Sequence, residues 1–137
     1  MTPHLSTFRV YYEDTDMGGV VYYANYLKFL ERGRSDAVRA AGMEQLKMRD
    51  EEDTIFVVRR VEADYLKPAR FDDILTIETG ITDVKGASFV MPQRVLRGEE
   101  VLLTARITAA VMSLSGRPKR LPAEMRASFA TLFGINL

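Results

Sequence analysis

Two aspartates beside a pair of glycines and a helix start are the residues of this chain best suited to chemistry. Asp14 and Asp16 precede Gly18 and Gly19, and the chain then enters a segment with helical spacing. A helix start carries unpaired backbone N–H groups and the positive end of the helix dipole. A carboxylate beside such groups can act as base or nucleophile while they hold an oxyanion, which is the minimum that acyl chemistry requires.

Each of these residues also has a simpler interpretation. Asp16 fits an ordinary turn or helix-cap aspartate, and Asp14 is expected to be structural, accepting bonds from backbone N–H groups of the loop. Gly18 and Gly19 are expected to permit positive φ angles and the close approach of a ligand. Residues 14–16 resemble a fragment of a calcium loop, but Gly-Gly-Val-Val follows instead of further oxygen ligands, so we predict no metal site.

The predicted helix after the loop must position it. Apolar residues recur at helical spacing along one stripe, which comprises Tyr26, Phe29, Leu30, Gly33, Ala37, Ala40 and Ala41. Its small members predict the close approach of another backbone surface, such as a sheet wrapped round the helix. Gly42 predicts the end of the helix. Leu27 and Val38 lie on the flank, which suggests a second contact, as with another subunit.

Alternating apolar and polar residues predict strands around this helix. After a tail at 1–6, we expect strands at 7–13, 54–65, 74–82, 88–96 and 101–114, a helical or irregular connection at 43–53, turns at 67–73, 83–86 and 97–100, a basic loop at 115–120, and a last helix at about 123–132. Val57 and Val61 are expected on one strand face. This order gives an α+β fold with an antiparallel sheet packed on one long helix. The other sheet face, rich in Val, Ile and Leu, is expected to need a cover, which points to a homo-oligomer.

Composition excludes several classes of protein. The 137 residues suit a single domain, and 19 basic residues balance 19 acidic ones, so no net field favours nucleic acid. The absence of cysteine rules out disulfides, thiol catalysis and cysteine metal sites. No signal-like segment or membrane-spanning apolar run is found, so we expect no membrane insertion and, by default, a cytoplasmic location.

The loop and helix start carry a family resemblance. It rests on residues 12–16, 18–22, 24–29 and 31–32, and continues through residues 65–69, Asp72-Asp73 and Leu121-Pro122. These motifs resemble the hotdog-fold acyl-CoA thioesterases of the 4-hydroxybenzoyl-CoA thioesterase family, and in particular its bacterial branch associated with the Tol–Pal system. The resemblance covers nearly the whole chain, and the helix-start motif is its most specific part.

This resemblance implies a single hotdog domain over residues 1–137, with a central helix wrapped by an antiparallel sheet. It also implies dimers joined sheet edge to sheet edge, often paired again into homotetramers, with active sites between subunits and no cofactor. The family's catalytic carboxylate matches Asp16, and the backbone N–H that polarises the thioester carbonyl matches Tyr23. Many members of the Tol–Pal branch have histidine at the latter position, whereas this chain has tyrosine.

The implied substrate is an acyl-CoA, with an acyl-carrier-protein thioester as a second option. We expect Gly18, Gly19, Val20 and Tyr26 to contribute to its binding. Basic residues are candidates to hold the CoA phosphates, and we select Arg59 and Lys85 from a set that also includes Arg60, Lys67, Arg117, Lys119 and Arg120. The acyl group is left open by the sequence.

The sequence leaves open the mechanism of Asp16, another hotdog-fold enzyme class, and a non-catalytic function. Asp16 is either a nucleophile or a general base that activates water. A hotdog-fold dehydratase or hydratase needs a histidine paired with an acid, and the single histidine, His4, matches no family site. A non-catalytic protein that binds acyl-CoA or an acyl carrier protein, or a scaffold in an envelope-associated complex, would keep the pocket without depending on the chemistry of Asp16.

Overall fold

An antiparallel sheet with the strand order β1-β3-β4-β5-β2 forms the framework of the molecule. The computed structural model describes residues 2–137. Its strands are β1 (His4–Arg9), β2 (Ile55–Tyr65), β3 (Ile74–Thr79), β4 (Ser88–Arg97) and β5 (Glu100–Met112), and its helices are α1 (Tyr26–Ala40), α2 (Gln45–Glu52) and α3 (Ala123–Phe133), with short 3₁₀ turns η1 (Tyr12–Asp14) and η2 (Tyr23–Asn25). The predicted α+β fold, one long helix on an antiparallel sheet, is confirmed.

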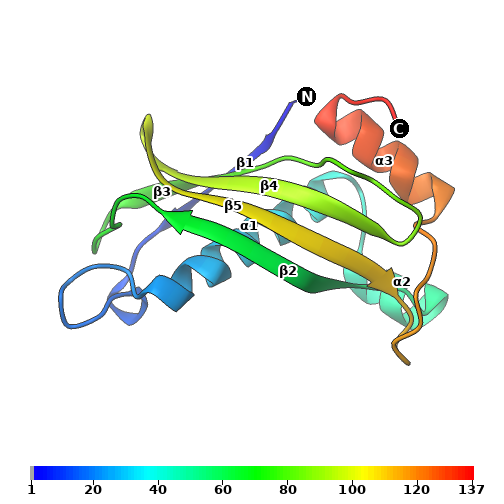
Figure 1. Cartoon of the computed structure of the whole chain (residues 1–137), viewed down its shortest axis with the longest axis horizontal. Helices are drawn as coiled ribbons and strands as arrows, with labels where there is room; N and C mark the ends of the chain where they lie inside the picture. Colours follow the sequence, from blue (N-terminus) through cyan, green and yellow to red (C-terminus); the bar gives the residue numbers. More distant parts are fainter. Residues whose placement is uncertain (1) are drawn as a thin grey trace.

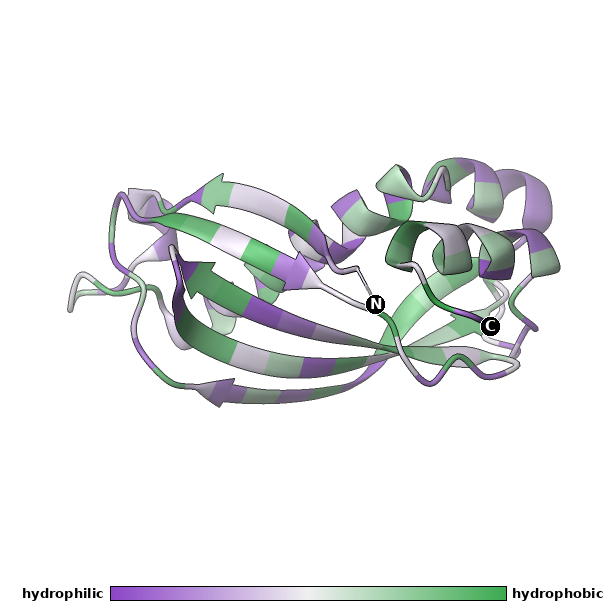
Figure 2. Cartoon of the chain, turned by 90° about the horizontal axis from the view of Figure 1, so that it is seen from above, coloured by the Kyte–Doolittle hydropathy of each residue, from purple (hydrophilic) through white to green (hydrophobic). Residues whose placement is uncertain are grey.

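Helix α1 packs along one face of the sheet, while α2 and α3 lie together at one end (Figure 1). The close approach predicted from Gly33 is present, because a Cβ built on this residue would clash with Cγ2 of the buried Ile77 on β3. Figure 2 shows hydrophobic and hydrophilic residues alternating along the strands, as expected when one sheet face meets the core. The helix ends before Gly42, which has a φ of +86°.

The face of the sheet that points away from α1 is more polar than predicted. It carries the ion pairs Arg94–Glu78, Arg60–Glu62 and Arg106–Asp83. The expectation that this face is rich in Val, Ile and Leu and needs a cover is therefore wrong for its central part, and it gives no independent support for an oligomer.

Two sequence predictions fail because of neighbours that periodicity does not reveal. Val57 and Val61 lie on opposite faces, because the register of β2 with β5 shifts between Val58 and Arg60 and the extra residue reverses the alternation. On α1, Val38 is buried and Ala40 is exposed.

The first strand also starts and ends earlier than predicted. Residues 4–6 belong to β1 rather than to a tail, and the chain leaves the sheet after Arg9 to form η1. Strand β3 likewise ends at Thr79 instead of residue 82. The early end of β1 leaves the chain after Arg9 free to form η1 and the loop that folds against the start of α1.

Candidate active site

The loop between η1 and α1 folds back on itself as a short hairpin. Thr15 and Val21 form an antiparallel bridge, and the Asp16 N–H donates to the Val20 carbonyl at 2.9 Å. The Gly19 N–H donates to the Asp16 carbonyl at 3.0 Å, and Gly19 has a φ of +78° that favours glycine. The hairpin therefore brings Asp16 back alongside the residues that enter the helix.

Asp16 itself is exposed at the tip of this hairpin. Its Oδ1 accepts the Gly18 N–H at 2.9 Å, which fixes the carboxylate in an Asx turn. No donor within residues 2–137 bonds its Oδ2. Gly18 does not have the positive φ predicted for it; instead a Cβ there would lie 3.3 Å from Asp16 Oδ1. The arrangement holds one carboxylate oxygen in place and leaves the other available for a substrate or a water.

Asp14 has the structural role predicted for it. Its side chain is buried and its Oδ2 accepts the Tyr11 N–H at 2.8 Å. Its carbonyl accepts both the Tyr22 N–H and the Asn25 side-chain amide, each at 3.0 Å. Asp14 thus ties the strand end, the loop and the helix start together, and its carboxylate is buried with Oδ2 bonded to the backbone.

Tyr23 opens the 3₁₀ turn η2, which continues directly into α1. Its N–H finds no acceptor in the described part of the chain, as expected for the first residue of a helical segment. Its carbonyl accepts the Tyr65 hydroxyl at 2.9 Å, so β2 anchors the turn. The exposed Tyr23 ring packs against Tyr22 and Tyr65.

The tyrosines around the helix start are electrostatically linked to Asp16. The pKa of Tyr22 is raised, chiefly by Tyr23 and to a smaller extent by the charge of Asp16. Burial raises the pKa of Tyr26, opposed by the bond from the Ala69 N–H and reinforced slightly by Asp16. Tyr22 and Tyr26 are therefore neutral at physiological pH, and the Asp16 carboxylate lies close enough to the helix start to act on both.

The predicted binding residues fall into two groups. Gly18, Gly19 and Val20 belong to the hairpin with Asp16. Tyr26 is buried, and its hydroxyl accepts the Ala69 N–H at 2.8 Å, so within one chain it anchors the site from the core.

Arg59 and Lys85 lie apart from this group within one chain. Arg59 is on β2, six residues before Tyr65, or on the order of 20 Å along the strand. Lys85 lies near α3, where its carbonyl accepts a bond from Arg126. Their role in binding CoA stays a prediction.

Sequence reasoning missed the residues that hold the loop from behind. Ala69 accepts the Val21 N–H at 2.8 Å, and Arg70 forms an isolated bridge with Val20. The turn of residues 67–73 was predicted, but its pairing with the hairpin joins segments about fifty residues apart, which local patterns do not reveal.

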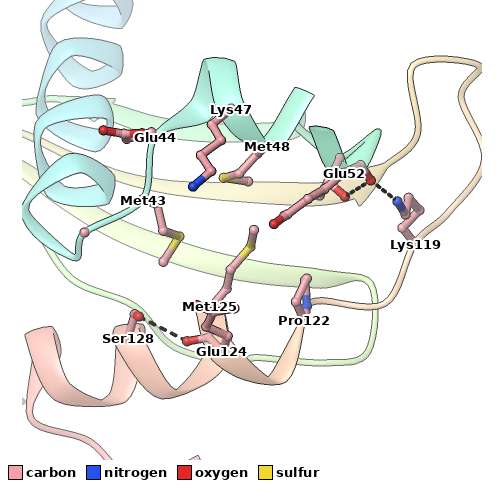
Figure 3. Close-up of a pocket in the computed structure, with 12 residues that line it drawn as sticks. Met43, Glu44, Lys47, Met48, Glu52, Lys119, Pro122, Glu124, Met125 and Ser128 are labelled. Carbon is pink, nitrogen blue, oxygen red and sulfur yellow. Dashed lines mark hydrogen bonds between the residues drawn. The ribbon is translucent and has the colours of Figure 1, made fainter. Parts of the chain in front are cut away.

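A cavity of about 400 Å³ lies at the far end of the molecule, between α2 and α3. Met43, Met48 and Met125 line it, and Lys47 and Glu52 reach into it from α2 (Figure 3). Figure 1 places this end opposite the Asp16 hairpin. The cavity includes Lys119, one of the wider set of basic candidates for the CoA phosphates, but none of the residues selected for the site, so the two regions are separate.

Comparison with known proteins points to one family. Residues 18–104 match the model of the Thioesterase superfamily. The chain is 41% identical over 122 residues to "Acyl-CoA thioesterase YbgC" of Haemophilus influenzae, covering 88% of this chain and 90% of that protein. It is 42% identical over 123 residues to "Acyl-CoA thioester hydrolase YbgC" of Escherichia coli O157:H7, covering 88% and 91%.

Solved structures give the same result. A probable thioesterase from Bartonella henselae superimposes with a TM-score of 0.86 at 42% identity, covering 88% of this chain and 100% of that one. A hypothetical protein from Aquifex aeolicus reaches a TM-score of 0.87 at 23% identity, covering 93% and 99%, which shows likeness of fold alone. These matches agree with the resemblance drawn from residues 12–32. No helix within residues 2–137 is long and apolar enough to cross a membrane.

Proposed function

This chain belongs to the Thioesterase superfamily and is a thioester hydrolase, and from this premise we propose that it hydrolyses acyl-CoA to a free carboxylic acid and CoA, using Asp16 and the backbone N–H of Tyr23. The observation that carries the proposal is the combination of a carboxylate oxygen and a helix-start N–H that have no hydrogen-bond partner within residues 2–137. The relatives named acyl-CoA thioesterases support the choice of substrate class.

Two routes fit this arrangement. As a general base, Asp16 takes a proton from water, the hydroxide adds to the thioester carbonyl, and collapse of the intermediate breaks the C–S bond while the proton passes to the CoA sulfur. As a nucleophile, Asp16 adds to the carbonyl, the CoA thiolate leaves, and water then hydrolyses the mixed anhydride. In both routes the Tyr23 N–H and the positive end of the helix stabilise the oxyanion.

The proposed enzyme is a homo-oligomer, a dimer or a pair of dimers, in which a second copy completes each site. Support comes from the exposure of large apolar side chains along the site and the adjoining edge of the sheet: Met17, Tyr22, Tyr23, Leu27, Val58, Val61 and Tyr65. In such an assembly Arg59 and Lys85 would bind CoA phosphates across the subunit boundary. The absence of cysteine fits the cytoplasmic location that we also propose.

The test is thiol release from a panel of short-chain, long-chain and aromatic acyl-CoAs and one acyl-carrier-protein thioester. We expect steady turnover of at least one acyl-CoA, and the preferred member identifies the acyl class. If the folded oligomer binds acyl-CoA stoichiometrically but releases no thiol from any thioester, the chain is a binding or scaffold protein and the proposal fails. Turnover of the carrier-protein thioester alone would replace the proposed substrate.

A further inference from the structure

We propose that Arg97 is a positioning residue for the active-site hairpin, acting through the brace formed by residues 67–73. This inference rests on the proposed function, since the geometry that it fixes is that of Asp16 relative to the helix start. Arg97 is the last residue of β4 and is remote in sequence from the loop. Any effect of Arg97 on the hairpin must therefore pass through the residues of the brace that lie between them.

The first step joins Arg97 to both ends of the brace. Its Nη1 donates to Asp73 Oδ2 at 2.7 Å and to the Pro68 carbonyl at 3.2 Å. Its Nη2 donates to Glu100, whose other carboxylate oxygen accepts Lys67 Nζ at 2.9 Å. A planar guanidinium can serve these acceptors at once, whereas a lysine ammonium cannot reproduce the fork.

The second step joins the brace to the two halves of the proposed site. The Ala69 carbonyl accepts the Val21 N–H, while the Ala69 N–H donates to the buried Tyr26 hydroxyl, both at 2.8 Å. Arg70 pairs with Val20 in an antiparallel bridge, and its N–H donates to Asp73 Oδ2 at 2.8 Å. Two consecutive residues, Ala69 and Arg70, thus contact the hairpin, and Ala69 also bonds Tyr26, the first residue of α1.

The last step reaches Asp16 directly, because its N–H donates to the Val20 carbonyl at 2.9 Å. The route from Arg97 to Asp16 therefore combines hydrogen bonds with short stretches of backbone: Arg97 and the Arg70 N–H share Asp73 Oδ2, and the preceding residue, Ala69, bonds Val21, which adjoins Val20. A shift of the brace moves the hairpin against the helix start, which changes the relative placement of the carboxylate and the Tyr23 N–H. Catalytic rate is sensitive to such a shift, since a misplacement of 1 Å can cost about a hundredfold.

Arg94 offers a matched control on the same strand. It makes a two-bonded ion pair with Glu78 at 2.8 and 2.9 Å, and its side chain is comparably exposed, 45% against 32% for Arg97. It makes no hydrogen bond or ion pair with the 67–73 brace in the described chain. Arg94→Met therefore removes an equivalent ion pair from β4 without loosening the brace.

The experiment compares Arg97→Met, Arg97→Lys and Arg94→Met in steady-state kinetics and in amide hydrogen exchange at Val21. For Arg97→Met we expect kcat to fall at least about tenfold with KM changed by less than about threefold, because positioning acts on the transition state. Arg97→Lys should recover only part of kcat. Exchange at the Val21 amide should accelerate in Arg97→Met and stay unchanged in Arg94→Met.

An unchanged kcat and an unchanged Val21 exchange rate in Arg97→Met would overturn the inference, as would a change in KM alone or equal losses in Arg94→Met. The exchange measurement needs no turnover, so it tests the brace even if the proposed reaction is wrong. If Arg97→Met does not fold, Glu100→Gln takes its place, because it weakens one arm of the same network. An unaltered Val21 exchange rate in that variant also counts against the brace.

Discussion

Asp14 and Asp16 are identical side chains two residues apart, and their different surroundings suit them to different roles. The carboxylate of Asp14 is buried and its Oδ2 accepts the Tyr11 N–H, while that of Asp16 is exposed and its Oδ2 accepts no bond from residues 2–137. The sequence already favoured the structural role for Asp14. Its buried hydrogen bond confirms that prediction, whereas the catalytic role of Asp16 stays a proposal.

Tyr26→Phe tests the anchor beneath the site. Removing the hydroxyl leaves the Ala69 N–H buried without its acceptor, which should lower the free energy of unfolding by about 1–3 kcal/mol. Burial raises the pKa of Tyr26 above its ordinary value of 10.0, so above this pH the unfolded chain loses its proton before the folded one. The contribution of Tyr26 to the stability of the wild type should therefore be fully present below about pH 10 and be lost as the pH rises further.

Urea unfolding of both proteins near neutral pH and above about pH 10 measures this effect. The wild type should lose more stability than Tyr26→Phe between the two conditions, since the variant lacks the titrating hydroxyl. Identical losses in both proteins would mean that Tyr26 does not titrate as described.

At the scale of elements, helical periodicity predicted α1 well, and strand alternation was less reliable. The apolar stripe predicted both ends of α1 to within one residue, because the residues that contact the core repeat with the helical period. The burial of Val38 and Ala40 was predicted wrongly, because α2 and α3 pack at the C-terminal end of α1 and change which side of the helix is buried there. The bulge at Arg59 was equally invisible, because it depends on pairing with β5.

Gly33→Ala tests the close packing of α1 on β3. Alanine is the better helix former by about 1 kcal/mol, but its Cβ would clash with Cγ2 of Ile77, which is fully buried and cannot move aside. We expect a net loss of about 1–3 kcal/mol in urea unfolding, as for overpacked cores. The double variant with Ile77→Leu, which lacks the Cγ2 methyl on Cβ, should recover part of this loss. A single variant more stable than the wild type would contradict the packing described.

At the scale of the whole molecule, exposed apolar side chains lie where we propose that a second copy binds. Val58 and Val61 lie on the α1 side of the edge strand β2 and are 48% and 43% exposed. The opposite face carries ion pairs instead. A second copy is therefore expected at the β2 edge and beside α1, not across the outer face.

Val61→Lys tests this assembly. A lysine there should weaken association, because its charge would be buried against the second copy, and sedimentation should show a shift towards monomer at concentrations where the wild type is oligomeric. Asp64→Lys places the same side chain on the outer face of the same strand and should leave the oligomer intact. An unaltered oligomer in Val61→Lys, or a monomeric wild type, would contradict the proposed arrangement.

The sequence could predict the hairpin residues of the site but not what supports them. Asp16, Gly18, Gly19 and Tyr23 are adjacent in the chain, so local turn and helix signals bring them together. The brace of residues 67–73 and its link to Arg97 arise from contacts between distant segments. The distance from Arg59 or Lys85 to the hairpin depends on how copies assemble, which a single chain's pattern does not contain.

The most direct test of the proposed role of Asp16 is hydrolysis of the preferred acyl-CoA by Asp16→Asn, measured beside the wild type and Asp14→Asn. We expect Asp16→Asn to keep its fold and oligomeric state but to lose about 10²- to 10⁴-fold in kcat/KM. Asp14→Asn should chiefly lower the stability of the fold, since the Asp14 carboxylate is buried and hydrogen-bonded. Wild-type turnover by a well-folded Asp16→Asn protein would contradict the assignment of Asp16 as the group that carries the reaction.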